Sequence, residues 1–284
     1  MRKFLGRLLV AMTVVAGLLT ANAPAYSAGK MIQVKGSDTM VNLMSNLAEE
    51  YMTAHPGATV AVTGGGSGTG IAAMLNGTTD ICASSRSLKK EEEDMAASKN
   101  IAPTSVTIGL DGLAVMVNPK NPVAELSIEQ LRKIYTGEYT NWQDVGGPSK
   151  PIVLLSRESN SGTYVYFQEH VLNKADYAKT ALLMPSTAAI AKAVGDDEAA
   201  IGYGGIAYAE HAPVKMIQVK TTADAPAVAP SMETVLNGTY PISRPLFLFT
   251  NGAPSGDVKT FIDYCLSDAG QKVVTDTGYI PTPK

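Results

Sequence analysis

Residues 152–163 read Ile-Val-Leu-Leu-Ser-Arg-Glu-Ser-Asn-Ser-Gly-Thr and lead into a helix-like segment that begins Tyr-Val-Tyr-Phe. The apolar run is typical of a buried strand, and the Ser-Gly-Thr turn is typical of a helix start. A helix N-terminus directs unpaired backbone N–H groups at one spot, where its dipole favours negative charge. Arg157 adds a planar guanidinium that matches two oxygens of a phosphate or carboxylate group. This stretch therefore predicts an oxyanion site at a strand-to-helix junction.

Two other turns of similar composition also lie between a strand-like run and a helix-like run. Residues 64–70 read Gly-Gly-Gly-Ser-Gly-Thr-Gly, after an apolar run at 59–62 and before another at 71–75. Residues 36–39 read Gly-Ser-Asp-Thr and precede a long amphipathic segment. Three such turns predict a site in which several backbone and hydroxyl donors converge on an anion.

Strand-like and helix-like segments alternate along most of the chain, which predicts an α/β fold with mainly parallel sheets flanked by helices. We expect two lobes around a cleft, with lobe one at residues 29–109 plus 243–284 and lobe two at 110–242. Ligands of open α/β sheets bind outside the carboxyl ends of the strands, so both lobes would present helix N-termini to one site. The predicted strands are 31–34, 59–62, 80–83, 106–110, 113–117, 152–155, 200–203, 216–219 and 246–249, and the main predicted helices are 39–54, 70–75, 89–98, 128–135, 187–194 and 258–275.

Residues 1–27 have the pattern of a secretory signal peptide. Arg2, Lys3 and Arg7 form a basic start, and residues 8–19 form an apolar segment that is too short to span a bilayer. Several triplets of small residues follow, and we place cleavage after Ser27. Because no cysteine lies near that position, we expect a periplasmic protein without a membrane anchor.

The composition argues against several classes of function. The chain has 23 basic and 26 acidic side chains, and removal of the three basic residues of the signal peptide leaves a net charge of −6. A chain this acidic is not expected to bind nucleic acid, so the anion site has to act through local dipoles and hydrogen bonds. No Cys or His spacing indicates a metal or another cofactor. Cys82 and Cys265 could form a disulfide after export, but we favour two buried thiols.

The sequence gives little support for an enzyme. A serine nucleophile needs a general base, and the histidines, His55, His170 and His211, lie outside the three turns. The glycine-rich run at 64–70 lacks the Gly-Lys-Ser/Thr of a P-loop and the spacing of a dinucleotide-binding turn. We therefore expect a binding protein with no catalytic residues.

The order and spacing of these motifs resemble the PstS-like group, which are the periplasmic phosphate-binding proteins of phosphate ABC importers. The resemblance covers nearly all of the chain after the signal peptide. It implies the two-lobe fold of type II periplasmic binding proteins, inorganic phosphate buried between the lobes, and the membrane subunits of an ABC importer as partners; we expect a monomer. The segments that carry it are 35–40, 66–70, 80–86, 111–118, 131–142, 157–163 and 200–203.

The resemblance also implies phosphate ligands from all three turns. Arg86 is expected either to contact the ligand or to support Asp38, and Glu158 is a second candidate close to the site. The predicted phosphate ligands are Ser37, Asp38, Thr39, Ser67, Ser85, Arg157, Ser161, Gly162 and Thr163.

One departure from the family concerns the proton of phosphate. Many members carry an aspartate at the position of Ser85, where it accepts this proton, and this chain has Ser85-Arg86 instead. Asp38 is our candidate acceptor; the alternative is that Asp38 only caps the following helix, in which case the acceptor could be Glu158. A buried carboxylate accepts a proton from phosphate but repels sulfate, which has none to donate. Such a mismatch supports discrimination on the order of 10⁴-fold.

Two other functions stay open at this point. The site could bind another tetrahedral oxyanion, such as tungstate, molybdate or sulfate. Alternatively, the protein could be an exported phosphate sensor without a role in transport.

Overall fold

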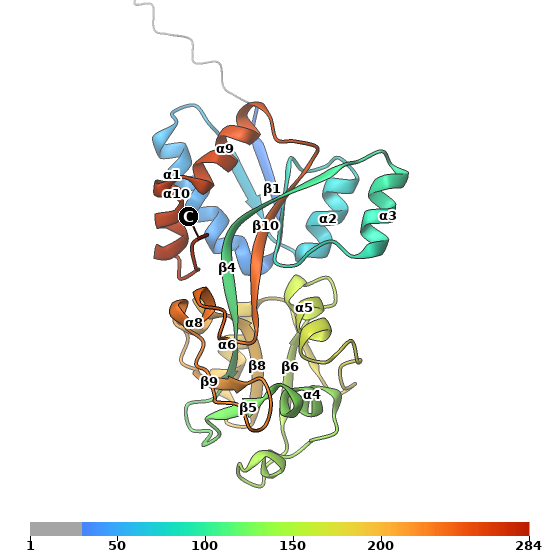
Figure 1. Cartoon of the computed structure of the whole chain (residues 1–284), viewed down its shortest axis with the longest axis vertical. Coiled ribbons are helices and arrows are strands. Elements are labelled where there is room, and N and C mark those ends of the chain that lie inside the picture. The colour runs from blue at the N-terminus through green and yellow to red at the C-terminus, as the bar shows by residue number, and fades with distance from the viewer. Residues whose placement is uncertain (1–29, 284) are drawn as a thin grey trace, which may run out of the picture.

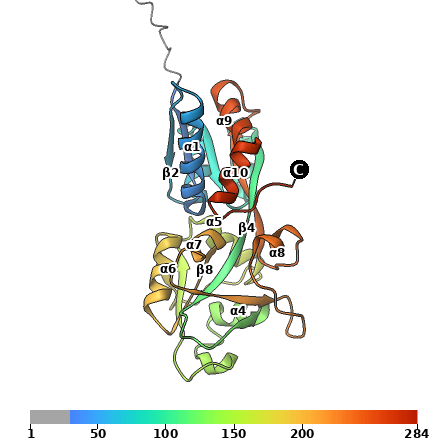
Figure 2. The same cartoon turned by 90° about the vertical axis from the view of Figure 1, so that its left-hand side faces the viewer.

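The computed structural model describes residues 30–283, so the predicted signal peptide at residues 1–27 lies outside the described residues. Figure 1 shows two groups of elements, one above the other, joined by two long strands, β4 (Pro103–Val117) and β10 (Ser243–Asn251). We call the upper group lobe one and the lower group lobe two. In the view of Figure 2, β4 again runs from one lobe into the other. Across residues 30–283, no helix has both the length and the apolar character that a membrane crossing requires.

Lobe one is built on a small parallel sheet covered by helices. β1 pairs in parallel with β2 on one edge and with β3 on the other, so that Val34 lies opposite both Val62 and Ile81. The three turns predicted from the sequence follow β1, β2 and a strand of lobe two. The elements of lobe one are β1 (Ile32–Gly36), the 3-10 helix η1 (Asp38–Met40), α1 (Val41–Ala54), β2 (Val60–Thr63), α2 (Ser67–Leu75), β3 (Ile81–Ser84), α3 (Lys90–Ser98), α9 (Gly256–Leu266) and α10 (Asp268–Asp276).

Lobe two contains the remaining helices and strands. Its helix α4, predicted at 128–135, begins after Ser127, whose hydroxyl accepts the Gln130 N–H, and ends at Gly137 in the left-handed conformation. The elements of lobe two are β5 (Glu125–Ser127), α4 (Ile128–Thr136), the 3-10 helix η2 (Trp142–Val145), β6 (Val153–Arg157), α5 (Gly162–His170), β7 (Leu182–Met184), α6 (Thr187–Asp196), β8 (Ala200–Gly205), α7 (Ile206–Ala209), β9 (Lys215–Lys220) and α8 (Met232–Leu236).

The two connecting strands form one antiparallel ribbon. β10 pairs with β4 from Ser243 opposite Gly112 to Asn251 opposite Pro103. From Leu113 onward, β4 pairs instead with β8 of lobe two. Every antiparallel pair among the named strands of the described chain involves β4 or β10. The strands that belong to a single lobe are therefore paired with one another in parallel, as predicted.

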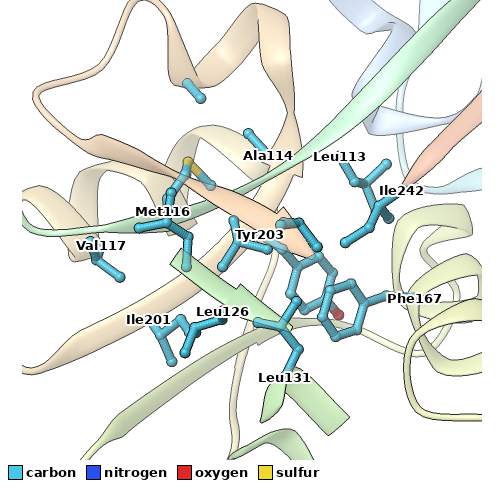
Figure 3. Packing of buried hydrophobic residues seen from close by; sticks show 14 of the residues in the cluster. Leu113, Ala114, Met116, Val117, Leu126, Leu131, Phe167, Ile201, Tyr203 and Ile242 are labelled. Atoms are coloured by element: carbon cyan, nitrogen blue, oxygen red, sulfur yellow. The ribbon is translucent and has the colours of Figure 1, made fainter. Parts of the chain in front are cut away.

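The larger hydrophobic core lies in lobe two and holds α5 against the sheet. Figure 3 shows side chains from β4, β5, α4, α5 and β8 meeting there, among them Met116, Leu126, Leu131, Phe167 and Tyr203. The rings of Phe167 on α5 and Tyr203 on β8 stack with their centroids 4.0 Å apart. Burial of an aromatic side chain contributes about 2 kcal/mol. This packing fixes the position of α5, whose N-terminus carries the third turn.

Two predicted element boundaries were wrong. We expected the Asp-Gly pair at 111–112 to end a strand, but β4 runs through it because the Asp111 carboxylate is bound by Arg244 on β10, with Nη2 and Oδ2 2.8 Å apart. The helix predicted at 258–275 is two helices, α9 and α10. The chain is extended at Ser267, whose hydroxyl accepts the Gly270 N–H and begins α10.

Both cysteines are free and buried, one in each of two separate elements of lobe one. Cys82 lies on β3 and Cys265 lies on α9. This agrees with the interpretation of two buried thiols. Burial raises the pKa of the Cys82 thiol to about 12, because the thiolate would lose its hydration.

Candidate functional site

The three predicted turns meet where the two lobes touch. The turns after β1 and β2 belong to lobe one, and the turn after β6 belongs to lobe two, where it begins α5, which faces lobe one in Figure 1. Asp38 is partly exposed, and the other predicted ligands are buried: Ser37, Thr39, Ser67, Ser85, Arg157, Ser161, Gly162 and Thr163. The structure thus brings all nine predicted residues to one interlobe region.

Three serine hydroxyls of lobe one form a hydrogen-bonded cluster. The Ser37 Oγ donates to the Ser85 Oγ at 3.0 Å, and the Ser85 and Ser67 Oγ atoms lie 3.3 Å apart. The Ser67 Oγ also accepts the Ser85 N–H at 3.1 Å. Gly162 of lobe two lies directly against this cluster, because a Cβ at this position would lie 2.2 Å from the Ser67 Oγ. The serine cluster and the N-terminus of α5 therefore share one small volume.

A threonine from each lobe completes the contact between the turns. Thr39 of η1 and Thr163 of α5 have their Oγ1 atoms 2.8 Å apart, within hydrogen-bond distance. At the same helix end, the Ser161 hydroxyl caps α5 by accepting the Thr163 N–H at 3.2 Å. Hydroxyls can donate to an anion as well as to each other. The two threonines can thus serve as donors that come from opposite lobes.

Arg157 is held rigidly at the end of β6. Its Nη1 donates to the Thr187 Oγ1 at 2.9 Å, and its Nη2 donates to the Pro185 carbonyl at 3.0 Å. Its Nη1 also lies 3.0 Å from the Asp38 Oδ2 of the other lobe. Burial lowers the pKa of the Arg157 guanidinium, and the Asp38 carboxylate opposes this effect. Acceptors of the protein itself therefore hold the Arg157 guanidinium in one orientation.

The Asp38 carboxylate reaches across to lobe two and does not cap its own helix. Its Oδ2 accepts the Thr187 N–H at 3.0 Å in addition to its ion pair with Arg157. η1 has no side-chain cap, since Ser37 precedes it without a capping hydrogen bond. Of the two roles considered for Asp38, the geometry therefore excludes simple capping of η1 and places the carboxylate next to Arg157.

Neither Arg86, expected to contact the ligand or to support Asp38, nor Glu158, the alternative proton acceptor, has a side-chain hydrogen bond to Asp38 in the described part of the chain. Arg86 is buried and forms a two-point ion pair with Glu92, with both N–O distances 2.7 Å. Glu158 is exposed, and its carbonyl oxygen accepts the Ser161 N–H at 3.0 Å. Arg86 therefore stabilises the start of α3, and Glu158 shapes the turn through its backbone.

Asn160 docks onto the glycine-rich turn of lobe one, a contact that sequence reasoning missed. Its Nδ2 donates to the Gly65 carbonyl at 3.0 Å, and its own carbonyl accepts the Gly68 N–H at 3.0 Å. Gly66 has a φ of +97°, and a Cβ there would lie 2.7 Å from the Asn160 carbonyl oxygen. Glycine is thus required both by the backbone conformation and by the close approach of the other lobe. The available signal was the unusual density of glycine at 64–70.

Arg244 is a second buried arginine at the site and was also missed. Its Nη2 donates to the Thr163 Oγ1 at 3.0 Å and to the Asp111 Oδ2 at 2.8 Å. Burial raises the pKa of the Asp111 carboxyl, and the Arg244 guanidinium opposes this. The sequence signal was a lone arginine immediately before the apolar run at 245–249.

Each arginine at the site is thus paired with an aspartate, Arg157 with Asp38 and Arg244 with Asp111. Two such pairs carry no net charge, so an anion at this region would be held mainly by oriented donors and helix dipoles. Within residues 30–283, no group of three or more Asp, Glu, His or Cys side chains is placed to hold a metal ion. The arrangement is suited to binding a small oxyanion.

Comparisons with known proteins agree with this site. A family model described as the PBP superfamily domain matches residues 20–269. The phosphate-binding protein PstS of Pseudomonas aeruginosa is 34% identical over an alignment of 310 positions, which covers 98% of this chain and 95% of that protein. The phosphate-binding protein PstS of Staphylococcus haemolyticus is 35% identical over 257 positions, with 88% and 80% covered.

Solved structures show the same likeness. A Clostridium perfringens protein with bound phosphate, described as a phosphate ABC transporter substrate-binding protein, superposes with a TM-score of 0.81 at 32% identity and covers 89% of this chain and 100% of that chain. An ABC-type phosphate transport receptor from Vibrio cholerae gives a TM-score of 0.72 at 33% identity, with 89% and 100% covered. The predicted fold class, that of type II periplasmic binding proteins, is confirmed by this likeness.

Proposed function

Because the chain belongs to the family of PstS phosphate-binding proteins, we propose that it binds inorganic phosphate between its two lobes and delivers it to the membrane subunits of an ABC importer. The observation that carries the proposal is the convergence of three buried, hydroxyl-rich turns and Arg157 from both lobes. The protein is a binding protein and not an enzyme. Incubation with a chromogenic phosphate ester should accordingly give no turnover.

The proposed ligands are the nine residues of the interlobe region. Ser67 and Thr163 stand in the first turns of α2 and α5, where the helix dipole favours an anion. Arg157 supplies a charged donor through the second N–H of its Nη2, because its other N–H groups donate to Asp38, Thr187, Pro185 and Met184. Roughly ten hydrogen bonds, many of them charge-assisted, support micromolar or tighter binding. The proposed set is Ser37, Asp38, Thr39, Ser67, Ser85, Arg157, Ser161, Gly162 and Thr163.

Asp38 is the proposed acceptor for the proton of phosphate. Its Oδ2 lies 3.0 Å from the Arg157 Nη1 and accepts the Thr187 N–H at 3.0 Å, so carboxylate oxygens stand next to the arginine of the site as acceptors. Sulfate carries no proton, so its oxygens would face this carboxylate without a hydrogen bond between them. Phosphate is therefore favoured over sulfate, and molybdate or tungstate is a less suitable ligand for the same reason.

The division of the chain and its location also belong to the proposal. Lobe one would comprise residues 29–109 plus 243–284, and lobe two residues 110–242. Both boundaries fall on the β4–β10 ribbon, close to where β4 changes partner. We further propose that the protein acts as a monomer in the periplasm after removal of residues 1–27, and that it does not bind nucleic acid.

The first experiment is calorimetric titration of the ligand-stripped mature protein with phosphate and, separately, with sulfate at neutral pH. Tight binding of phosphate with no response to sulfate is the expected result. Binding of sulfate alone would refute the phosphate assignment. Loss of phosphate uptake on deletion of the gene separates the import role from that of a sensor, which would leave uptake unchanged.

Asp38→Asn tests the proton acceptor. The amide keeps the size of the side chain but removes the ion pair with Arg157 and replaces one carboxylate oxygen by an NH2 donor, which can bind an unprotonated oxygen of sulfate. We expect phosphate binding to weaken about 10- to 100-fold and sulfate binding to become measurable. Asp196→Asn, which changes an exposed carboxylate on α6, is the matched control and should bind like the wild type. Unchanged phosphate affinity with no response to sulfate would assign the proton acceptor to another group.

A further inference from the structure

Arg244 and Asp111 form a buried ion pair at the junction of the lobes. They are cross-strand partners on β10 and β4, one residue away from the point where β4 leaves β10 and joins β8. Their side chains are 1% and 0% exposed. The Arg244 Nε and Nη2 lie 3.2 and 2.8 Å from the same carboxylate oxygen, Asp111 Oδ2. The guanidinium is therefore fixed to the connecting ribbon and not to either lobe alone.

From this position Arg244 reaches one hydroxyl of each lobe. Its Nη2 lies 3.0 Å from the Oγ1 of Thr163 on α5 and 3.5 Å from the Oγ1 of Thr39 on η1. The two threonine oxygens are 2.8 Å apart. Arg244 thus contacts a pair of hydroxyls that come together only when the lobes are in contact.

The count of donors shows what this contact does. A guanidinium only donates, and each terminal nitrogen has two protons. One proton of the Arg244 Nη2 is used by Asp111 and the other by Thr163, so this nitrogen has none left for an anion. The Arg244 Nη1 is buried and has no hydrogen-bond partner among the described residues. The Thr163 oxygen has to accept from Arg244, and one hydroxyl proton joins the two threonine oxygens. The remaining hydroxyl proton is free to be donated to a ligand.

We infer that Arg244, anchored by Asp111, is a positioning residue that presents the hydroxyls of Thr39 and Thr163 as donors to the bound phosphate. The inference rests on the proposed function of the site. Asp111 balances the charge of Arg244, and the Arg244 Nη2 acts by orienting the two hydroxyls. It also links the geometry of the connecting ribbon to the geometry of the site.

Arg244→Lys is the test variant, because lysine keeps the charge opposite Asp111 but lacks the Nε that, together with Nη2, fixes the group on the Asp111 carboxylate. We expect phosphate binding to weaken about 10- to 100-fold, as for the loss of one hydrogen bond from a charged donor. Arg132→Lys, on the surface of α4, is the control and should leave affinity unchanged. If Arg244→Lys does not fold, the neutral pair Arg244→Gln with Asp111→Asn replaces it.

A double-mutant cycle with Thr163→Val separates positioning from general damage. If Arg244 acts through the hydroxyl, Arg244→Lys should cost about twofold or less in the Thr163→Val background. The loss of phosphate affinity in Arg244→Lys should also be larger at a pH where phosphate is mainly a dianion. A monoanion can donate its own proton to a hydroxyl that is no longer oriented as a donor, and a dianion has fewer protons to donate.

The outcomes are distinct. Equal losses in both backgrounds, or equal losses at both pH values, would overturn the positioning role. Wild-type affinity in Arg244→Lys would also overturn it, while leaving the proposed function intact. A wild-type protein that gives no response to phosphate would refute the proposed function and this inference together.

Discussion

Gly162→Ala should separate ligand binding from folding. Gly162 is the first residue of α5, and a Cβ there would lie 2.2 Å from the Ser67 Oγ and 2.6 Å from the Ser85 Oγ. Both of these neighbours belong to lobe one. The added methyl group would therefore disturb the contact between the lobes while leaving lobe two itself intact.

The size of the effect follows from these distances. The shorter one is more than 1 Å below the 3.4 Å at which ordinary van der Waals contact begins. Overpacking of this kind costs about 1–3 kcal/mol, which corresponds to a Kd raised about 5- to 150-fold. In the ligand-free protein, replacing glycine by alanine in a helical conformation should instead raise the free energy of unfolding by about 0.5 kcal/mol.

The assay combines calorimetric titration with phosphate and thermal unfolding of the ligand-free protein. Gly195→Ala is a matched control, because it lies in α6 and the nearest atoms to its Cβ belong to Pro213 of the same lobe. This control should keep wild-type affinity. The reasoning is refuted if Gly162→Ala binds phosphate within about twofold of the wild type, or if its unfolding temperature falls by several degrees.

Three further predictions concern the scaffold. Burial raises the pKa of Cys82 to about 12 and raises the pKa of Cys265 as well. Neither thiol should therefore react with a disulfide reagent at pH 8 until the protein is unfolded. Rapid labelling of the native protein would contradict this. Burial alone would raise the pKa of Glu92, but its hydrogen bonds to Arg86 and to the backbone outweigh that effect and lower the pKa. The ionised Glu92 therefore stabilises the fold at neutral pH. This stabilisation is lost as the pH falls below the ordinary pKa of a glutamate and through the lowered pKa of Glu92. Glu92→Gln should accordingly lower the free energy of unfolding in urea by about 3 kcal/mol at pH 7 and by much less at pH 3, and an equal loss at both pH values would disprove the ion-pair explanation. Burial raises the pKa of Tyr203 to about 12, so the phenol keeps its proton above pH 10 in the native state and loses it in the unfolded state. The free energy of unfolding should therefore fall as the pH rises past 10. An unchanged urea midpoint between pH 9 and pH 11 would count against this.

Local patterns predicted those parts of the molecule that depend on nearby residues. The strand, turn and helix around Arg157 were found because an apolar run, a serine cap and a glycine occur in order within twelve residues. The helix predicted at 128–135 matches α4 to within one residue, and Ser127 and Gly137 on either side of it are strong cap signals. The predicted ligands of all three turns lie together because each turn follows a strand of a parallel sheet.

What the sequence did not predict depends on partners far away along the chain. The Asp-Gly pair at 111–112 has the composition of a turn, and only the contact with Arg244 more than a hundred residues later keeps β4 continuous. In the same way, the Asp38 carboxylate is bound by Arg157 and the Thr187 N–H, whose positions are set by lobe two. Interlobe ion pairs of this kind leave no periodic signal in one sequence.

The paired ribbon of β4 and β10 limits how the lobes can move. Two separate linkers would allow the lobes to slide, twist and part in many directions. Here the two segments are joined along nine residue pairs, so relative motion reduces to the bending of a single strip. With few degrees of freedom, little conformational entropy is lost when the lobes come together. Thr39 and Thr163 therefore meet in the same alignment each time the cleft shuts.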